Sequence, residues 1–203
     1  LFDPEKRSFH SFRHDPRNPY SISSDEITAL APASGGIWVA NYSTGVDFYH
    51  PQQRNFSHFN AHTVEGMPSG HIWSICEDQR GFLYIGHLKN GLTVVSIKDK
   101  TARNYRYRTN DPSSIPNDEV ICLFIDPKEN IWVGTRNGLA LFNTNTGRFR
   151  TFRHIPGDES SLLTNQIYDL SYKPENELWI SCRMGGVSIL DLNQDLHNPQ
   201  TPV

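Results

Sequence analysis

Cysteine and basic charge are both scarce in this chain of 203 residues. The three cysteines, Cys76, Cys122 and Cys182, lie far apart and form no CxxC pair, which argues against a disulfide framework and a cysteine metal clamp. Nineteen basic side chains face 22 acidic ones, so the net charge is −3. This balance excludes the strongly cationic footprint of a general nucleic-acid binder, and we expect no nucleic-acid partner.

Long apolar runs and helix-forming runs are also missing. Hydrophobic residues make up 36% of the chain, and no run approaches the length that spans a bilayer. The first ten residues, LFDPEKRSFH, lack the apolar core of a signal peptide, and we expect no direct membrane contact. Aromatic residues reach 11%, and glycine and proline together number 27. This composition predicts an all-β protein with many turns.

The chain repeats itself with a period of about 47 residues. Four short segments share one pattern: 37–40, 83–86, 131–134 and 178–181. Their aromatic residues, Trp38, Tyr84, Trp132 and Trp179, are separated by steps of 46, 48 and 47 residues. A glycine follows each segment, at Gly45, Gly91, Gly138 and Gly186. Because several markers keep one period, we interpret the chain as a repeat protein.

Each repeat resolves into four short strands, as the third one shows at 120–125, 131–134, 139–142 and 149–154. Four antiparallel strands in 40 to 50 residues are typical of a β-propeller blade. A single blade cannot bury both of its faces, so blades stack on one another. We therefore predict that the four aromatic markers, Trp179 included, are buried between blades.

The positions at which the repeats begin divide the chain into complete and incomplete propeller blades. Residues 1–24 form the end of a blade, with 9–14 resembling the outer strand 149–154. Three full blades follow at 25–69, 70–117 and 118–164, and 165–203 is an incomplete blade whose last residues, 198–202, add no outer strand. The N-terminal strand could complete the last blade and close a four-bladed ring. We favour a slice of a longer propeller, whose exposed blade faces would be covered by further blades or by a second copy of the chain.

The blade motif resembles a known family. Residues 130–143 read NIWVGTRNGLALFN, and 105–120 read YRYRTNDPSSIPNDEV. These motifs are similar to two-component regulator propeller repeats, as in the periplasmic sensor domain of Bacteroides-type hybrid two-component system histidine kinases. The resemblance recurs along the whole chain. It departs at Tyr84, where the family has tryptophan, and in the irregular bridge 60–67.

The resemblance implies a function. It indicates a non-catalytic, extracytoplasmic sensor module that binds a glycan-derived oligosaccharide and signals to a histidine kinase outside this chain. It also implies a longer parent, anchored in the inner membrane, with its sensor in the periplasm, and a homodimer. Two alternatives stay open: a purely architectural propeller segment, and a propeller lyase or glycosidase.

The topology of a blade points to a binding surface. Loops from strand two to strand three and from strand four to the next strand one emerge on the same face. Their side chains differ between repeats while the framework recurs, as expected of a recognition surface on a fixed scaffold. Aromatic, cationic and amide groups suit a sugar ring and its acidic substituents. The candidate ligand-binding residues are Asn41, Tyr42, His71, His87, Lys89, Arg136, Asn137 and Arg183, bordered by Asp118 and Asn165.

Catalytic, metal and cofactor sites are not predicted. His10 and His14, like His58 and His62, are four residues apart, which places them roughly 13 Å apart on a strand. Adjacent carboxylates such as Asp118 and Glu119 point to opposite faces of a strand, so they cannot act as a catalytic pair. No nucleophile elbow, phosphate-binding loop or dinucleotide fingerprint is present.

Overall fold

The fold consists of strands and turns. The computed structural model describes residues 2–3, 7–194 and 196. The predicted tail at 198–202 and parts of the predicted blade end at 1–24 lie outside the described residues. No helix in the described part of the chain is long and apolar enough to cross a membrane.

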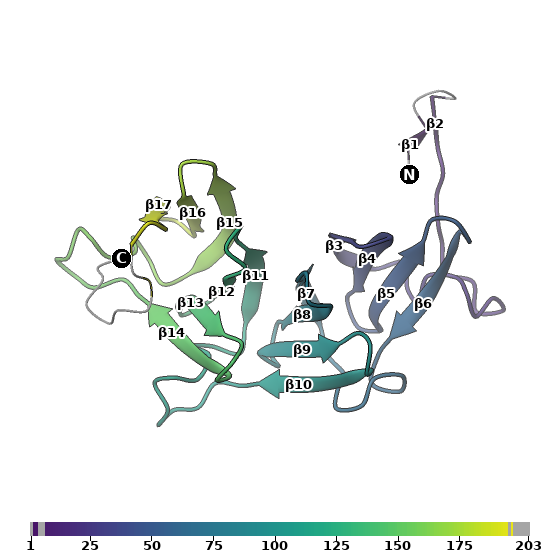
Figure 1. Cartoon of the computed structure of the whole chain (residues 1–203), viewed down its shortest axis with the longest axis horizontal. Coiled ribbons are helices and arrows are strands. Elements are labelled where there is room, and N and C mark those ends of the chain that lie inside the picture. Colours follow the sequence, from purple (N-terminus) through teal and green to yellow (C-terminus); the bar gives the residue numbers. More distant parts are fainter. Residues whose placement is uncertain (1, 4–6, 195, 197–203) are drawn as a thin grey trace.

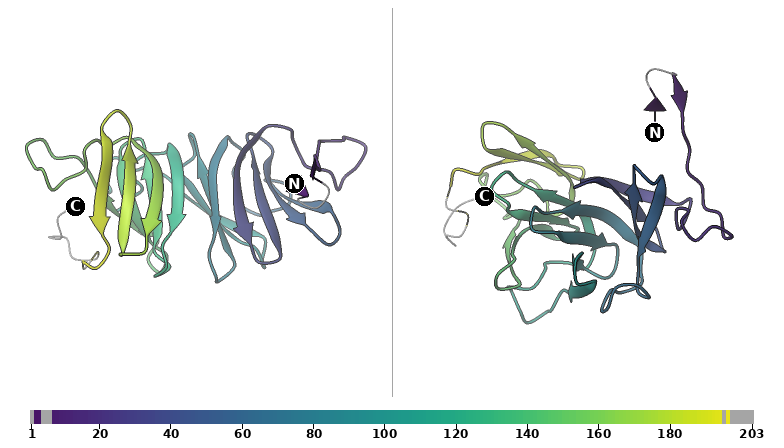
Figure 2. Two further views of the ribbon diagram at one scale, coloured as in Figure 1. Left: turned by 90° about the horizontal axis from the view of Figure 1, so that it is seen from above. Right: turned by 45° about the vertical axis from the view of Figure 1, so that its right-hand side comes forward.

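Four antiparallel sheets follow one another along the chain (Figures 1 and 2). The first contains β3 (Ile27–Ala33), β4 (Gly36–Asn41), β5 (Gly45–His50) and β6 (Asn55–Phe59). The second contains β7 (Ile72–Glu77), β8 (Phe82–His87), β9 (Leu92–Ser96) and β10 (Thr101–Tyr105). The third contains β11 (Val120–Ile125), β12 (Ile131–Thr135), β13 (Gly138–Asn143) and β14 (Arg148–Phe152). The fourth has three strands, β15 (Ile167–Lys173), β16 (Glu177–Cys182) and β17 (Gly186–Asp191). The predicted all-β fold of propeller blades is confirmed.

The sheets stack through their first strands, with β7 between β3 and β11, and β11 between β7 and β15. These strands form the concave inner side of the arc, and β6, β10 and β14 form its outside (Figure 1). Close stacking requires small residues on the second strand. A Cβ added to Gly134 would lie 2.8 Å from Cγ2 of Ile167 in the next sheet. A Cβ added to Gly86 would lie 2.6 Å from Cγ1 of Val120, which explains why the repeat keeps a small residue at this position.

The burial of the aromatic markers differs between the first three blades and the last one. Trp38, Tyr84 and Trp132 are fully buried between sheets, as predicted. The same prediction is wrong for Trp179, which is 38% exposed. No described sheet packs on its face of the fourth sheet, so Trp179 shares an exposed apolar surface with Val187 and Ile189.

The N-terminal segment does not close a ring. β1 (Phe2–Asp3) pairs only with β2 (Ser8–Phe9), and this hairpin projects away from the larger sheets (Figure 1). The outer strand suggested for 9–14 is absent beyond Phe9, because these residues have no neighbouring strand to pair with in the described chain. The fourth sheet keeps three strands and the arc stays open, as expected of a partial propeller.

Candidate functional site

The loops from second to third strands form one surface with the residues that precede each first strand. We call this surface the loop face. Backbone hydrogen bonds build it in the same way in every sheet: Tyr42 N–H donates to Glu26 O, Leu88 to His71, Arg136 to Glu119, and Arg183 to Gln166, at 2.8 to 3.2 Å. The loop face is therefore a rigid scaffold whose side chains can differ between blades.

The long connections between blades are held by their own polar side chains. Asp111 accepts hydrogen bonds from the backbone N–H and the hydroxyl of Ser113, which lower its carboxyl pKa. Asp158 and Ser160 repeat this arrangement one blade later. The acidic and serine residues of the bridge motif thus fix loop shape.

The half-buried Tyr42 and the exposed His71 form an aromatic pair between the first and second sheets. Their ring centroids are 4.2 Å apart and the rings are nearly parallel, at 8°. Ile72 N–H donates to Tyr42 O, which ties the two loops together. A cavity of about 270 Å³ opens in the same loops, lined in part by Ser43, Thr44 and the irregular bridge at His62.

Charged side chains gather between the second and third sheets. Arg136 forms an ion pair with Glu119 at 3.1 Å, and Arg106 forms one with Asp118 at 2.7 Å. Sequence reasoning missed Arg106, although it lies in the connection after β10, within the bridge motif at 105–120. Lys89 and Arg183 are exposed and have no acidic partner among the described residues.

Two exposed aromatic residues on the inner strands were also missed. Each first strand begins with a β-bulge in which one extra residue interrupts the register. Trp73 and Tyr168 occupy this bulged position in β7 and β15, and they are 42% and 59% exposed. Bulges re-aim side chains out of the sheet. The available sequence signal was an aromatic residue one position after the start of the second and fourth apolar runs.

Two of the eight predicted ligand-binding residues are buried, so we no longer expect them to contact a ligand directly. The Asn41 amide donates to Asp47 Oδ2 at 3.0 Å, and His87 Nε2 lies 2.9 Å from Thr93 Oγ1. Burial, together with the nearby charge of Arg106, lowers the pKa of His87 to about 4. Asn137 is half-buried, and its backbone N–H donates to Thr135 Oγ1. The other five predicted residues remain available on the loop face.

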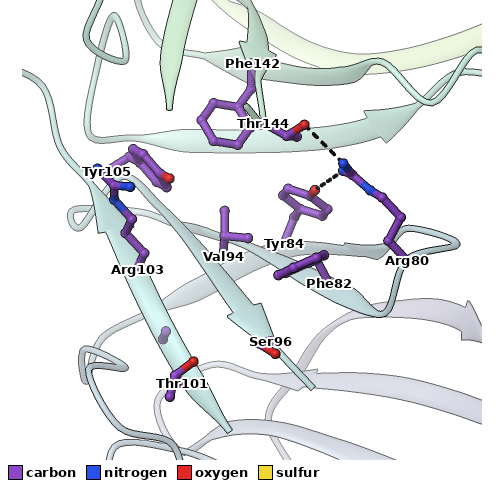
Figure 3. Close-up of a pocket in the computed structure, with 11 residues that line it drawn as sticks. Arg80, Phe82, Tyr84, Val94, Ser96, Thr101, Arg103, Tyr105, Phe142 and Thr144 are labelled. Carbon is purple, nitrogen blue, oxygen red and sulfur yellow. Dashed lines mark hydrogen bonds between the residues drawn. The ribbon is translucent and has the colours of Figure 1, made fainter. Parts of the chain in front are cut away.

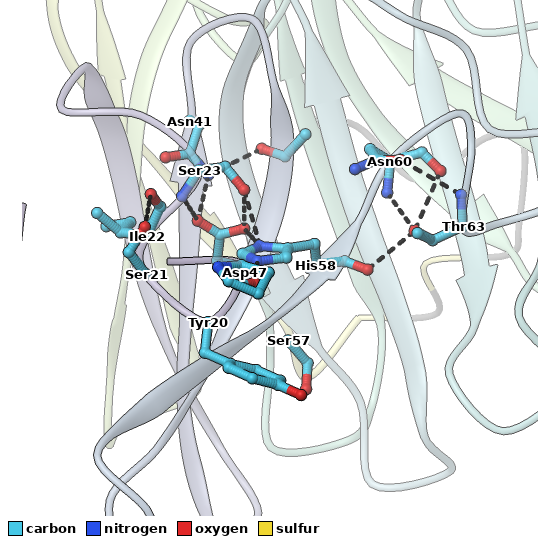
Figure 4. A network of polar contacts seen from close by, with 12 residues as sticks. Tyr20, Ser21, Ile22, Ser23, Asn41, Asp47, Ser57, His58, Asn60 and Thr63 are labelled. Atoms are coloured by element: carbon cyan, nitrogen blue, oxygen red, sulfur yellow. Dashed lines mark hydrogen bonds and ion pairs between the residues drawn. The ribbon is translucent and has the colours of Figure 1, made fainter. Parts of the chain in front are cut away.

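A serine, a histidine and an aspartate meet in the first sheet, which the sequence did not indicate (Figure 4). Asp47 Oδ1 lies 2.7 Å from His58 Nδ1 and accepts from the Ser23 hydroxyl at 2.5 Å. Ser23 lies against the same ring nitrogen, while His58 Nε2 bonds to Pro19 O. In a catalytic triad the serine and the acid bind opposite nitrogens. The network therefore closes the first blade onto the preceding loop and does not activate Ser23.

Comparison with known proteins agrees with this geometry. Residues 66–89 and 114–137 match the two-component regulator propeller family. The extracellular domain of the putative hybrid two-component system BT3049 from B. thetaiotaomicron is 32% identical over 96% of this chain, with a TM-score of 0.79. The chain contains two-component regulator propeller repeats. It covers 24% of the length of that domain.

Other solved structures share the propeller fold. The extracellular domain of the putative one-component system BT4673 from B. thetaiotaomicron is 20% identical, with a TM-score of 0.72 over 93% of this chain and 24% of the other. The WD40 β-propeller domain of Doa1 is 11% identical, with a TM-score of 0.61 over 80% and 50% of the two chains. No curated protein matches the chain.

The matched regulator propeller segments coincide with the scaffold of the loop face. They contain β7 and β8, and β11 and β12, together with the residues that precede β7 and β11. The matched segments also include the loop-face residues His71, Lys89 and Arg136. Within the described residues, no group of three or more metal-ligating side chains gathers.

We predict that two histidines of these repeats give the fold opposite pH responses. Burial alone lowers the pKa of His58, but its bonds to Asp47 and Pro19 and the Asp47 charge raise it above 6.5. The stability that protonated His58 contributes to the fold is complete below pH 6.5 and is lost as the pH rises through the raised pKa. His87 must lose its proton to fold, so its contribution is complete above pH 6.5 and is lost toward pH 4, by at most about 3 kcal/mol.

Chemical denaturation between pH 4 and 8 measures both effects. The His87→Gln variant is expected to lose stability less steeply than the wild type between pH 6.5 and 4. The His58→Asn variant is expected to flatten the profile above pH 6.5. A profile that is identical in wild type and both variants would show that neither histidine is linked to folding.

Proposed function

We propose that this chain is part of the non-catalytic sensor region of a hybrid two-component signalling protein. The observation that carries the proposal is the 32% identity, over 96% of the chain, to an extracellular domain of a putative hybrid two-component system. The chain spans about a quarter of that domain. The histidine kinase, the inner-membrane anchor and the homodimer belong to the parent in this proposal, and the sensor lies in the periplasm.

The proposed ligand is an oligosaccharide bound on the loop face. Trp73, Tyr168 and the Tyr42–His71 pair offer aromatic surfaces of the kind that stack on sugar rings. Lys89 and Arg183 offer cationic groups without acidic partners in the described chain, which suit uronate or sulfate substituents. The rigid backbone beneath these side chains lowers the entropic cost of binding, because the loops are ordered before the ligand arrives.

In the proposed mechanism, ligand binding shifts the packing of blades or of subunits, and this shift biases the kinase. A ligand moves such an equilibrium only by its difference in affinity for the two states. The loop face is suited to this because its first three loops are bonded to the start of the next blade, whose first strand packs on the neighbouring sheet. A small change at a loop is thereby coupled to blade stacking.

Substitutions on the loop face test the proposal in the complete sensor protein. Arg183→Ala is expected to weaken oligosaccharide binding at least about tenfold, since a charged hydrogen bond contributes about 1.5–3 kcal/mol. Trp73→Ala removes an aromatic stacking surface and is also expected to weaken binding. Arg136→Ala is expected to have a smaller effect because Arg136 is already paired with Glu119. Lys98→Ala is the matched control, since Lys98 is exposed in the turn between β9 and β10, at the opposite end of the sheet.

Isothermal titration calorimetry measures the affinity, and circular dichroism checks that each variant is folded. Unchanged affinity in all folded loop-face variants would contradict the proposal and favour a purely architectural role for these blades. Turnover of the bound saccharide by the wild type would instead identify a propeller lyase or glycosidase.

A further inference from the structure

A cavity of about 310 Å³ lies between the second and third sheets, near the starts of β8 and β10 and the end of β13 (Figure 3). We call it the inter-blade pocket. It lies toward the end of the sheets opposite to the loop face. Both sheets that form it are complete in this chain. Its lining residues are Arg80, Phe82, Tyr84, Val94, Ser96, Thr101, Ala102, Arg103, Tyr105, Phe142 and Thr144.

The pocket exists because the second blade carries smaller side chains than its neighbours. In the first blade, Trp38 pairs with Phe48, and their rings pack 4.8 Å apart. The paired residues in the second blade are Tyr84 and Val94. Asp78 and Arg80 also hold the Tyr84 hydroxyl, at 2.9 and 3.1 Å. The space that a tryptophan and a phenylalanine would fill is therefore open.

Positive charge enters the pocket from two sides. Arg80 donates to the buried carboxylate of Asp78 at 2.7 Å, and another of its nitrogens reaches Thr144 of the third sheet at 3.2 Å. Arg103 lies over the Tyr105 ring at 5.1 Å and has no acidic partner among the described residues. No aspartate or glutamate lines the pocket. One of the two arginines is therefore not neutralised, and the pocket favours an anion.

The walls between the arginines are aromatic. Phe82, Tyr105 and Phe142 line the pocket, and Phe82 is exposed at its mouth. Aromatic faces bind the apolar faces of flat rings, and guanidinium groups bind carboxylates with paired hydrogen bonds. A volume of about 310 Å³ is at the small end of ligand pockets. We propose that the inter-blade pocket binds a carboxylate carried on a single six-membered ring, at a site separate from the loop face.

An acidic sugar and an aromatic acid both carry a carboxylate on a six-membered ring, and the test compares the binding of the two. Glucuronate probes an acidic sugar, benzoate probes an aromatic acid, and glucose is the neutral control for the sugar. The protein is titrated with each compound by calorimetry or by NMR. We expect one of the two carboxylates to bind at least tenfold more tightly than glucose.

Variants then place the binding in the pocket. Val94→Phe introduces the residue found at the equivalent position of the first blade, and it is expected to abolish binding while leaving the melting temperature unchanged or raised. Arg103→Gln removes the positive charge but keeps a polar side chain, and it is expected to weaken binding at least tenfold, so it tests the site even if Val94→Phe does not fold. Lys173→Ala, at the end of β15 and outside both the inter-blade pocket and the loop face, is expected to bind like the wild type.

Two results would overturn the proposal. If neither carboxylate binds more tightly than glucose, the pocket is a packing defect of the second blade. If a carboxylate binds but Arg103→Gln and a folded Val94→Phe bind it equally well, the ligand occupies another site.

Discussion

Trp132→Ala is expected to lower the free energy of unfolding by about 3–5 kcal/mol. Trp132 is fully buried, its ring packs against Phe152, and its indole N–H donates to Asp126 Oδ2 at 3.0 Å. Truncation leaves a cavity between the third and fourth sheets and removes a partner of a buried carboxylate. Both effects reduce the stability of the same blade interface.

Trp179→Ala is the matched control for this prediction. Trp179 occupies the equivalent position of the last sheet, is 38% exposed and bonds to Glu177 at 2.9 Å. We expect a loss below about 1 kcal/mol, because little packing is removed at an exposed site. Urea denaturation followed by circular dichroism measures both variants. Equal losses would show that Trp179 is as well packed as Trp132 and would contradict the open arc.

Gly134→Val is the second change with a large expected effect, a loss of about 1–3 kcal/mol or more. An added Cβ at Gly134 has too little room beside Cys122 in the same sheet and Ile167 in the next. Because part of the obstacle is Ile167 of the neighbouring sheet, full relief requires the third and fourth sheets to move apart. The variant is therefore expected to loosen the stacking of blades.

Ser181→Val is the control for Gly134→Val. Ser181 holds the equivalent position in β16, where it pairs with Asp169 and Val187 and is half-buried. No described sheet packs on it, so the added methyl groups are expected to cost less than about 0.5 kcal/mol. Thermal unfolding compares the two variants. A tolerated Gly134→Val would contradict the account of why the repeat keeps a small residue there.

The repeating part of the fold was predictable from sequence because each marker has the same physical role in every blade. Trp38, Tyr84 and Trp132 recur since each fills the same space between sheets, and Gly86 and Gly134 recur since each lets a sheet approach. Trp179 broke the prediction because its burial depends on a neighbouring sheet and not on its own sequence position.

The candidate site was less predictable, since a position on a loop does not fix burial. Asn41 and His87 lie at the ends of second strands, and their side chains turn inward to Asp47 and Thr93. The Asp47–His58 pair joins residues on neighbouring strands with no motif in sequence. The inter-blade pocket arises from Tyr84 and Val94 together. The sequence revealed the change at Tyr84, but only the strand register shows that Val94 lies beside it.

A thermal-shift screen of the wild-type chain against acidic and neutral oligosaccharides tests the sensor proposal most directly, with product analysis to detect turnover. A ligand at about 100 times its Kd adds roughly 2.7 kcal/mol, which corresponds to a rise of about 5–10 °C in Tm at this size. We predict such a rise with one class of oligosaccharide, without turnover, and its loss in Arg183→Ala. No rise with any oligosaccharide on a folded sample would contradict a saccharide sensor in these blades.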